Sequence, residues 1–398
     1  MSKEAKLKIA MVSSIRPETN YTAYLIEALQ KYYSKDCEVL VYTDRDKHNL
    51  EVLLENVRLV WDRDWNFLFQ ILAQALKDKI DVIHFQHEIN MFGGPRTAIL
   101  FPFVVLFSRL FGFNPVVTIH AAVPVREFNV DFLKVFEWPK PKLLTPLVRV
   151  VFPTIYFLVG LFSKKIIVHS MGIKSILRND YKINGDKITV IPHGVPGAVG
   201  YNEQEVSASI KAKIYEKRFL LYFGYFHRRK GLEFLVRAFK QVSQKHPDLY
   251  LVLGGGTILP NYSKEIGELI SILGLSDKVI ITGFLNLTDL RYLLDKCEFV
   301  VLPAVYSIAA SGPLAQVFAH KKAVIVSDLG VYSEEVKSGV NGLLAKVADV
   351  KDLERNMLRL LDDQILKDFI VKSITVIHED RKWENIASKT LRVYEEIK

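Results

Sequence analysis

Short apolar segments alternate with longer amphipathic segments along the whole chain, and no other feature constrains the fold as strongly. The apolar segments are expected to be strands, at 6–13, 38–43, 81–85, 115–119, 165–168, 187–191, 219–223, 249–253, 278–282, 298–302 and 323–327. Because segments with helical periodicity separate most of them, the pattern predicts parallel, doubly wound α/β sheets.

The alternation is interrupted once, by the linker 192–197 (PHGVPG) and a polar segment that reaches Glu216. A chain of 398 residues exceeds what one ordinary hydrophobic core supports, so two domains are expected. We place their boundary at 198/199, and the second domain ends near 382. Ligands usually bind in the cleft between two such halves, at the carboxyl ends of their strands.

The N-terminal segment and the two cysteines indicate in which cellular compartment the protein resides. The segment MSKEAKLKIAMVSS carries charges at positions 3, 4, 6 and 8 and lacks the apolar stretch of a secretory signal. Cys37 and Cys297 lie far apart, without the spacing of metal ligands, and are expected to be free thiols in a reducing compartment. We therefore expect a cytoplasmic protein.

The net charge of +9 is concentrated in one region. Residues 93–178 hold 11 Lys and Arg against 3 Asp and Glu, a balance of +8, together with the apolar runs 97–108 and 150–163. The longer run has 14 uncharged residues, about 21 Å as a helix, which is too short to span a hydrocarbon core of about 30 Å. Two interpretations remain: buried core helices, or helices that rest on an anionic membrane surface. Nucleic acid is not an expected partner, because the cations lie among aliphatic residues without an aromatic stacking pattern.

The segment FLLYFGYFHRRKGLEFLVRAF (219–239) reads as a strand, a turn at Gly224, a basic loop and an amphipathic helix. Arg228, Arg229 and Lys230 therefore stand at a helix N-terminus, where backbone N–H groups and the helix dipole favour an anion. A solvated basic turn is the alternative. No glycine precedes Gly93, so the first strand–helix loop is not a glycine-rich phosphate site, which argues against a dinucleotide-binding first half.

At these residues the sequence resembles glycosyltransferase family 4, retaining enzymes of the GT-B fold, nearly from end to end. The likeness rests on the segment 219–239, on TGFLNLTDLRYLLDKCEFVVLP (282–303), on SGPLAQVFAHKKAVIVSDLGVYSEEVKSGVNGLL (311–344), and in the first half on QHEINMFGG (86–94), VVTIHAAVP (116–124) and the segment 165–196. It implies two Rossmann-like domains facing across a cleft, the first for the acceptor and the second for the nucleotide sugar. The segment 383–398 resembles the family's last helix, which returns to the first domain.

The resemblance assigns donor-side roles in the second half. Lys230 and Arg229 (or Arg228) would stabilise the negative charge of the departing nucleoside diphosphate. Backbone near the donor would come from glycine-rich strand ends and from a helix N-terminus: Gly224, Gly254, Gly255, Phe284, Ser311 and Gly312. For the glycines at the strand ends, such as Gly254 and Gly255, an ordinary turn without a ligand is the alternative interpretation.

The chain departs from the family pattern at three positions. Tyr225 stands where the family has an arginine after the glycine, and Ile308 and Gln316 stand where it has two glutamates. Gln316 still offers hydrogen bonds to a ribose, whereas Ile308 offers none to a sugar. These departures leave the identity of the donor open.

In the first half, His120 matches a family position near the donor sugar and the acceptor, where it would position a hydroxyl. His87, Glu88, Gly93 and Gly94 follow the strand 81–85 and are expected on the acceptor side. A structural histidine at a strand end is the alternative for His120. His193, in the linker, is a weaker candidate.

We therefore expect a retaining hexosyltransferase that uses a nucleoside-diphosphate sugar and acts on a lipid-linked or cell-surface glycan at the inner membrane face. No Asp-x-Asp motif occurs in a plausible donor loop, so no cofactor and no obligatory metal are expected. The alternatives are a soluble glycosyltransferase acting on a small sugar, a GT-B protein that binds nucleotide sugar without turnover, and an epimerase of the same fold.

Overall fold

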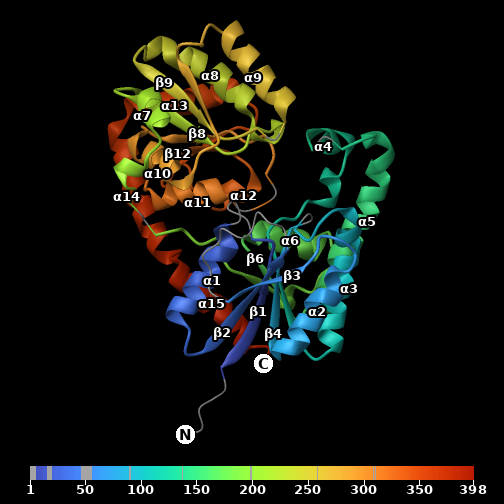
Figure 1. The fold of residues 1–398 in the computed structure, drawn as a ribbon. Coiled ribbons are helices and arrows are strands. Elements are labelled where there is room, and N and C mark those ends of the chain that lie inside the picture. The colour runs from blue at the N-terminus through green and yellow to red at the C-terminus, as the bar shows by residue number, and fades with distance from the viewer. Residues whose placement is uncertain are drawn as a thin grey trace. The chain divides into compact units, whose positions relative to one another are not determined.

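The computed structural model describes residues 6–15, 20–45, 56–88, 91–136, 138–197, 200–257, 259–307, 309 and 311–398. The chain divides into two compact units (Figure 1). Unit 1 comprises Met1–Gly194, Ile308–Ala310 and Arg381–Lys398, and unit 2 comprises Val195–Ser307 and Ser311–Asp380. The sequence placed the boundary at 198/199, close to this division.

Unit 1 is built on a parallel sheet of order β3-β2-β1-β4-β5-β6-β7. Its strands are β1 (Leu7–Val12), β2 (Cys37–Asp44), β3 (Val57–Trp61), β4 (Val82–His87), β5 (Asn114–Ile119), β6 (Lys165–Val168) and β7 (Ile188–Val190). Its helices are α1 (Asn20–Tyr32), α2 (Phe67–Asp78), α3 (Pro95–Leu110), α4 (Val130–Val135), α5 (Pro141–Phe162), α6 (Met171–Asn179) and α15 (Trp383–Glu395).

Helices cover both faces of this sheet, because successive side chains of a strand point to opposite faces. On β1, Ile9 and Met11 join the core beneath α1 and α15, whereas Ala10 and Val12 join the core beneath α2, α3 and α6. The last helix, α15, thus packs on α1 and completes the core of unit 1.

Unit 2 is built on a second parallel sheet, of order β10-β9-β8-β11-β12-β13. Its strands are β8 (Arg218–Phe223), β9 (Leu249–Gly254), β10 (Val279–Gly283), β11 (Val300–Leu302), β12 (Val324–Ser327) and β13 (Leu343–Ala345). Its helices are α7 (Ala208–Ile214), α8 (Leu232–Lys245), α9 (Pro260–Ile272), α10 (Leu287–Lys296), α11 (Gly312–Ala319), α12 (Gly330–Ser333), α13 (Val350–Asp362) and α14 (Gln364–Asp380).

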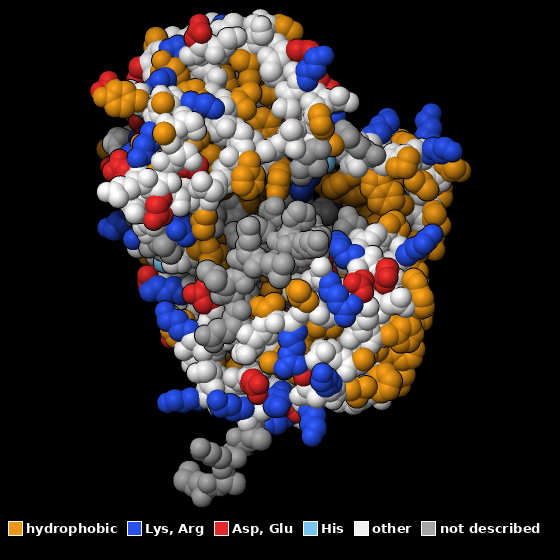
Figure 2. Space-filling model, viewed as in Figure 1, with side chains coloured by type: hydrophobic (Ala, Val, Ile, Leu, Met, Phe, Trp, Pro, Cys, Tyr) orange, Lys and Arg blue, Asp and Glu red, His pale blue; other side chains and the backbone are white. Residues whose placement is uncertain are grey.

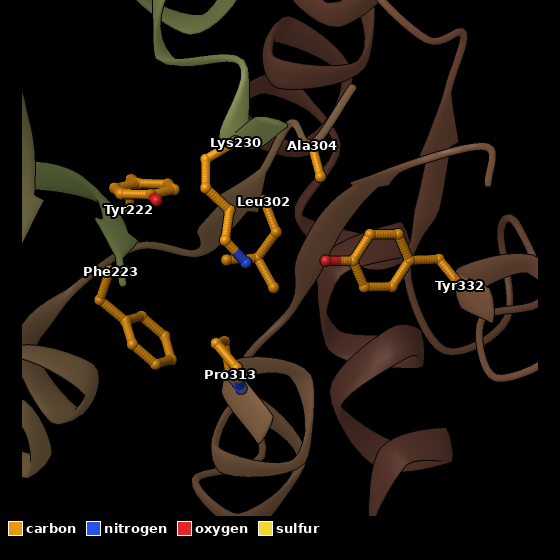
Figure 3. A pocket seen from close by; sticks show the side chains of 7 residues that line it. All are labelled: Tyr222, Phe223, Lys230, Leu302, Ala304, Pro313 and Tyr332. Carbon is orange, nitrogen blue, oxygen red and sulfur yellow. The ribbon is translucent and has the colours of Figure 1, made fainter. Parts of the chain in front are cut away.

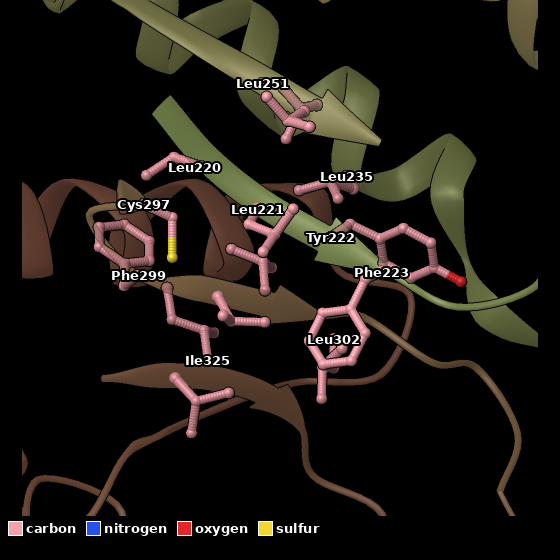
Figure 4. Packing of buried hydrophobic residues seen from close by; sticks show 14 of the residues in the cluster. Leu220, Leu221, Tyr222, Phe223, Leu235, Leu251, Cys297, Phe299, Leu302 and Ile325 are labelled. Atoms are coloured by element: carbon pink, nitrogen blue, oxygen red, sulfur yellow. The ribbon is translucent and has the colours of Figure 1, made fainter. Parts of the chain in front are cut away.

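The core of unit 2 centres on β8. Leu220 and Leu221 are fully buried, and side chains of β9, α8, β11 and β12 pack around them (Figure 4). Cys297 is a buried free thiol in this core, as Cys37 is in unit 1. Two doubly wound parallel domains, the fold class predicted from the sequence, are confirmed.

The longest helix differs from its expectation. The apolar run 150–163 suggested about 21 Å, but α5 begins at Pro141 and has 22 residues, about 33 Å. It is the one helix among the described residues that is long and apolar enough to cross a membrane, and 33% of its most apolar window is buried. The helix includes Arg149, whose Nε donates to the carbonyl of Phe128 at 2.7 Å.

Candidate functional site

A glycine-rich backbone edge lies beyond the carboxyl ends of β8 and β9. The N–H of Gly224 donates to the Gly254 carbonyl at 2.9 Å, and the N–H of Gly255 donates to the Gly283 carbonyl at 2.9 Å. Gly255 has a φ of +147°, and a Cβ there would lie 2.0 Å from the Gly224 carbonyl oxygen. Close backbone packing therefore requires glycine at this position, whether or not a ligand binds.

The neighbouring candidates leave more room for a ligand. Phe284, directly after β10, is 67% exposed, so its ring is available for contact. Tyr225 is 36% exposed, and its carbonyl accepts a hydrogen bond of 3.0 Å from the hydroxyl of Tyr222. The position where the family has an arginine thus holds a half-exposed tyrosine.

The basic loop forms a single 3-10 turn, Arg228–Lys230, followed by Gly231. The His227 side chain caps this turn by accepting from the N–H of Arg229. Gly231 has a φ of +66°, and a Cβ there would lie 2.2 Å from the Pro303 carbonyl oxygen. The turn is therefore held against the segment after β11 by a contact that only glycine allows.

The three cations of this turn have different surroundings. Arg228 is half-exposed and forms a bidentate pair with Glu265 of α9, with N–O distances of 2.8 and 2.6 Å. Its guanidinium also lies 5.2 Å from the ring centroid of Tyr262. Arg229 is near enough to Lys230 to lower the pKa of that ammonium electrostatically. Arg229 and Lys230, rather than Arg228, therefore remain the candidates for binding an anion.

Lys230 extends into a small pocket in unit 2 (Figure 3). The other lining residues are Tyr222, Phe223, Leu302, Ala304, Pro313 and Tyr332. Burial lowers the pKa of Lys230 to about 8, with Arg229 as a second cause. Within the described part of the chain, its ammonium forms no hydrogen bond or ion pair. A partly buried ammonium without a described partner, at the ends of parallel strands, is suited to an anion.

Two helix N-termini border this region. At α8, the N–H of Leu232 donates to the hydroxyl of Tyr262 at 3.2 Å, so a side chain already satisfies part of that terminus. At α11, Ser311 Oγ accepts from the N–H of Leu314 at 3.2 Å, and Gly312 begins the helix. Ser311 therefore serves as the helix cap, and Pro313 brings the first turn of α11 to the pocket.

Gln316 lies one turn into α11 and is partly exposed. Its side chain is available for hydrogen bonding, because no described residue binds it. Ile308 lies outside the described residues.

In unit 1, His120 follows β5 and belongs to a buried hydrogen-bond chain. Its Nδ1 lies 3.0 Å from His169 Nε2, and its Nε2 lies 2.8 Å from Gln86 Oε1. His84 continues the chain, with Nε2 3.3 Å from Gln86 Nε2 and Nδ1 2.6 Å from the Tyr394 hydroxyl. Both ring nitrogens of His120 therefore already have protein partners.

Burial disfavours the charged form of every histidine in this cluster. The pKa of His84 and of His169 falls to about 3, and that of His193 to about 4, mainly through desolvation. The pKa of His120 is also well below its usual range, with the other histidines adding to the burial effect. The rings pack around Tyr21, whose centroid lies 4.6 Å from that of His169 and 5.1 Å from that of His193.

The expected acceptor-side residues separate into two kinds. His87 is buried, stacks at 4.3 Å from Phe101, and its Nδ1 has no partner among the described residues. Glu88, the next residue, is exposed. Gly93 has a φ of +143°, and a Cβ there would meet the Thr97 side chain at 2.9 Å, so packing alone accounts for it. Gly94 caps α3 and has open space around it.

Several site residues carried no local sequence signal. Tyr332 reaches the pocket from α12, and Tyr222 comes from a strand that the sequence marks only as buried. His169, directly after β6, contacts His120, and Tyr394 of α15 joins the same chain of hydrogen bonds through His84. The hydrophobic periodicity of the sequence assigns such residues to helices and strands, but it does not show which side chains contact one another.

Solved structures share this fold, among them that of a glycosyltransferase from Rickettsia africae. The Anabaena protein HepE, whose crystal structure contains UDP and glucose, also has it. That structure superposes with a TM-score of 0.74 at 17% identity, and the match covers 98% of this chain and 100% of that one. At this identity the likeness shows the fold.

The family models identify the two halves. Residues 19–199 match Glycosyltransferase Family 4, and residues 204–374 match Glycosyl transferases group 1. The two halves of the chain thus resemble, in this order, a family 4 and a group 1 glycosyltransferase domain.

Two curated relatives illustrate the range of this group. An uncharacterized glycosyltransferase of Methanocaldococcus jannaschii is 27% identical over 238 residues, which are 58% of this chain and 60% of that protein. A lipopolysaccharide core biosynthesis mannosyltransferase of Rhizobium leguminosarum is 25% identical over 181 residues, 45% of this chain and 51% of that protein. The match thus spans less than two thirds of the length of either relative.

Proposed function

We propose that the protein is a retaining glycosyltransferase that moves a hexose from a nucleoside-diphosphate sugar to an acceptor hydroxyl. The observation that carries this proposal is the Lys230 ammonium, which lies unpaired by any described residue in the pocket of unit 2. A diphosphate offers that ammonium the anionic partner that burial requires. The UDP bound by the structural neighbour HepE supports a donor of this class.

The proposed reaction needs no protein nucleophile. The acceptor oxygen forms a bond to the anomeric carbon on the face where the bond to the diphosphate breaks, and the leaving phosphate oxygen takes the hydroxyl proton. Negative charge grows on the leaving diphosphate, and Lys230 with Arg229 stabilises it. Gly312 of α11 is proposed to add backbone N–H groups, and Gln316 hydrogen bonds to the ribose. No metal is required in this scheme.

The acceptor side is assigned to unit 1. We propose that His120 contacts the transferred sugar or the acceptor hydroxyl, and that Glu88 and the Gly93–Gly94 loop border the acceptor. His120 is 9% exposed, so only the edge of its ring is available to a ligand.

The first experiment is a thermal-shift panel of nucleoside diphosphates and their sugars, each at about 1 mM. A ligand at one hundred times its Kd stabilises the native state by about 2.7 kcal/mol. A selective shift identifies the base, and the sugar of that nucleotide is then offered with acceptors while the anomeric configuration of the product is followed by NMR. Loss of the shift in Lys230→Met supports the site, and turnover that survives EDTA supports the metal-free scheme.

Two results contradict this proposal. A product with inverted anomeric configuration rules out the retaining mechanism. Binding without transfer or hydrolysis favours a nucleotide-sugar-binding protein without turnover, a role consistent with Tyr225 and Ile308 at positions where the family has charged residues.

We further propose that the acceptor is lipid-linked and that unit 1 rests on the cytoplasmic face of an anionic membrane. Hydrophobic side chains gather on the surface where α3 and α5 run, and cations border them (Figure 2). The exposed apolar residues recur at helical spacing and are Leu143, Leu147, Val150, Phe157 and Leu161 on α5, and Ile99, Phe103 and Leu110 on α3. A contiguous exposed apolar face marks an interaction surface.

The charges of this surface complement anionic lipid. From Trp138 to Lys164 the sequence contains no Asp or Glu, whereas Lys140, Lys142 and Lys164 are exposed. None of the three forms an ion pair with a described residue. Each such cation near an anionic membrane contributes about 1 kcal/mol. Lys165, in contrast, pairs with Glu396 at 2.9 Å and is less available.

Sedimentation with phosphatidylglycerol-containing vesicles tests this part. Exchange of Lys140, Lys142 and Lys164 for Gln is expected to release most of the bound protein. The matched control exchanges Lys31, Lys35 and Lys77, which are exposed outside α3 and α5, for Gln. If the two triple variants bind the vesicles equally, the proposed membrane contact is wrong and a soluble acceptor is favoured.

A further inference from the structure

The buried chain around His120 has a fixed end. His169 Nδ1 lies 3.0 Å from the backbone carbonyl of Ile191, and a carbonyl oxygen only accepts hydrogen bonds. His169 therefore carries a proton on Nδ1. In a neutral imidazole the other nitrogen is then an acceptor, so His169 Nε2 offers a lone pair to His120.

The direction of the next hydrogen bond follows. His120 Nδ1 lies 3.0 Å from His169 Nε2, so it must donate its proton to that lone pair. A neutral His120 then has no proton left for Nε2, which is an acceptor. The atom of Gln86 that lies 2.8 Å from this nitrogen must consequently donate, which places the carboxamide NH₂ of Gln86 against His120.

The rest of the chain agrees with this assignment. With its NH₂ toward His120, Gln86 turns its carbonyl oxygen toward His84 Nε2, which also lies 2.7 Å from the Thr118 hydroxyl. His84 then carries its proton on Nε2 and accepts at Nδ1 from the Tyr394 hydroxyl at 2.6 Å. Each histidine nitrogen then has a partner of the right kind, and all three histidines are neutral. The assignment gives up the contact of 3.2 Å in which the Gln86 NH₂ faces Met11 Sδ.

The opposite assignment leaves one proton too many. If Gln86 Oε1 faced His120, acceptors would stand at both ends of the His120–His169 pair, and the pair would need three N–H groups. One ring would then be an imidazolium inside a buried cluster. Burial opposes that charge, in line with the lowered pKa of both histidines.

We propose that His169 is a positioning residue that holds His120 as the tautomer protonated on Nδ1, so that His120 meets a substrate hydroxyl as a hydrogen-bond acceptor through Nε2. The inference rests on the proposed role of His120 in the reaction. A hydroxyl that reaches His120 takes the place of the Gln86 NH₂ and must donate. The site thereby fixes the orientation of that hydroxyl, and a substrate group that only accepts is rejected.

Nitrogen-15 NMR of histidine-labelled protein tests the tautomer directly, without turnover. The chain has 10 histidines, and the His120→Gln variant identifies the His120 resonances. Between about pH 6 and pH 8 we expect a protonated Nδ1 and an unprotonated Nε2 on His120. A protonated Nε2, or an imidazolium on either member of the pair, overturns the inference even if the protein proves to be a glycosyltransferase.

Two variants test the positioning role. His169→Phe keeps the ring shape but removes the acceptor, so His120 is expected to shift toward the Nε2-protonated tautomer and kcat/KM to fall about tenfold, the effect of one hydrogen bond. His169→Gln presents a carbonyl oxygen, so it is expected to restore the tautomer and part of the activity. An unchanged tautomer in His169→Phe contradicts the role. If wild-type protein shows the expected tautomer but transfers no sugar, the proposed function fails and the structural assignment stands.

Discussion

Arg228 of the basic turn is bound by Glu265 of α9 through two hydrogen bonds of 2.8 and 2.6 Å. The sequence offered Arg228 and Arg229 as equal partners for Lys230. The ion pair separates them, because the carboxylate of Glu265 offsets the field of the Arg228 guanidinium and occupies two of its N–H donors. Arg229, which acts electrostatically on Lys230 and Tyr222, is the better candidate.

The two arginines are expected to differ when each is replaced by alanine. Arg229→Ala should weaken nucleoside-diphosphate binding about tenfold or more, because it removes a charge close to Lys230. Arg228→Ala should leave the affinity within about twofold and lower the free energy of unfolding by less than about 1 kcal/mol, as for exposed pairs. Titration calorimetry and urea unfolding measure both effects. Equal losses of affinity would mean that Arg228 leaves Glu265 when the donor binds.

Lys230 is expected to lower the stability of the fold. Burial depresses its folded-state pKa to about 8 from 10.5, so near pH 7 the native state holds a charge that it disfavours. Lys230→Met should raise the free energy of unfolding by about 2 kcal/mol at pH 7 while abolishing the nucleotide-induced thermal shift. Between about pH 8 and pH 10.5 the advantage of the variant should vanish, because the wild-type lysine becomes neutral in the native state. A less stable Lys230→Met would contradict this account.

Donor affinity is expected to fall in mild alkali. A diphosphate binds the charged ammonium, and free Lys230 loses its proton above about pH 8. The Kd of the preferred nucleoside diphosphate should therefore rise about tenfold between pH 7 and pH 9. Lys230→Arg, which stays charged, should bind with little change over the same range. If the Kd of the wild-type protein changed with pH as little as that of Lys230→Arg, the diphosphate would be bound by a charged group other than Lys230.

Gly255 and Gly267 form a matched pair of glycine-to-alanine tests. At Gly255 the new Cβ would lie 2.0 Å from a backbone oxygen, so Gly255→Ala should cost about 3 kcal/mol or more and disturb the edge at β8 and β9. Gly267 lies within α9 with no atom within 4 Å of its added Cβ. Gly267→Ala should therefore stabilise the protein by up to about 1 kcal/mol. Chemical denaturation followed by circular dichroism measures both.

The sequence predicted the helices and strands that a short run of neighbouring residues is enough to identify. Fully buried strands such as β1 and β8 appear as uninterrupted apolar runs, because helices cover both faces of the sheet. Two strands escaped prediction. β3 lies at an edge of its sheet and carries the half-exposed Arg58 and the exposed Leu59, and β13 has only three residues. Neither presents the buried run by which the others were found.

The site was predictable only in part, for the same reason. The turn 228–230 could be placed because a strand, a glycine and a helix follow one another in the sequence. The partner of each cation could not, because Glu265 and Tyr332 are distant in the chain. His120 was noted as a lone histidine, and only the fold shows that His169 and Gln86 occupy both of its nitrogens.

The assignment of α15 to unit 1 has a consequence for how this protein is made. A ribosome releases the strands of unit 1 first, yet their core stays open on the α1 side until Trp383–Glu395 has been translated. His84 likewise waits for the hydroxyl of Tyr394, 310 positions later. Unit 2, whose residues lie between, can close before the unit that precedes it. The half that begins synthesis is thus the last to mature, and apolar surface in the nascent chain needs protection for that interval.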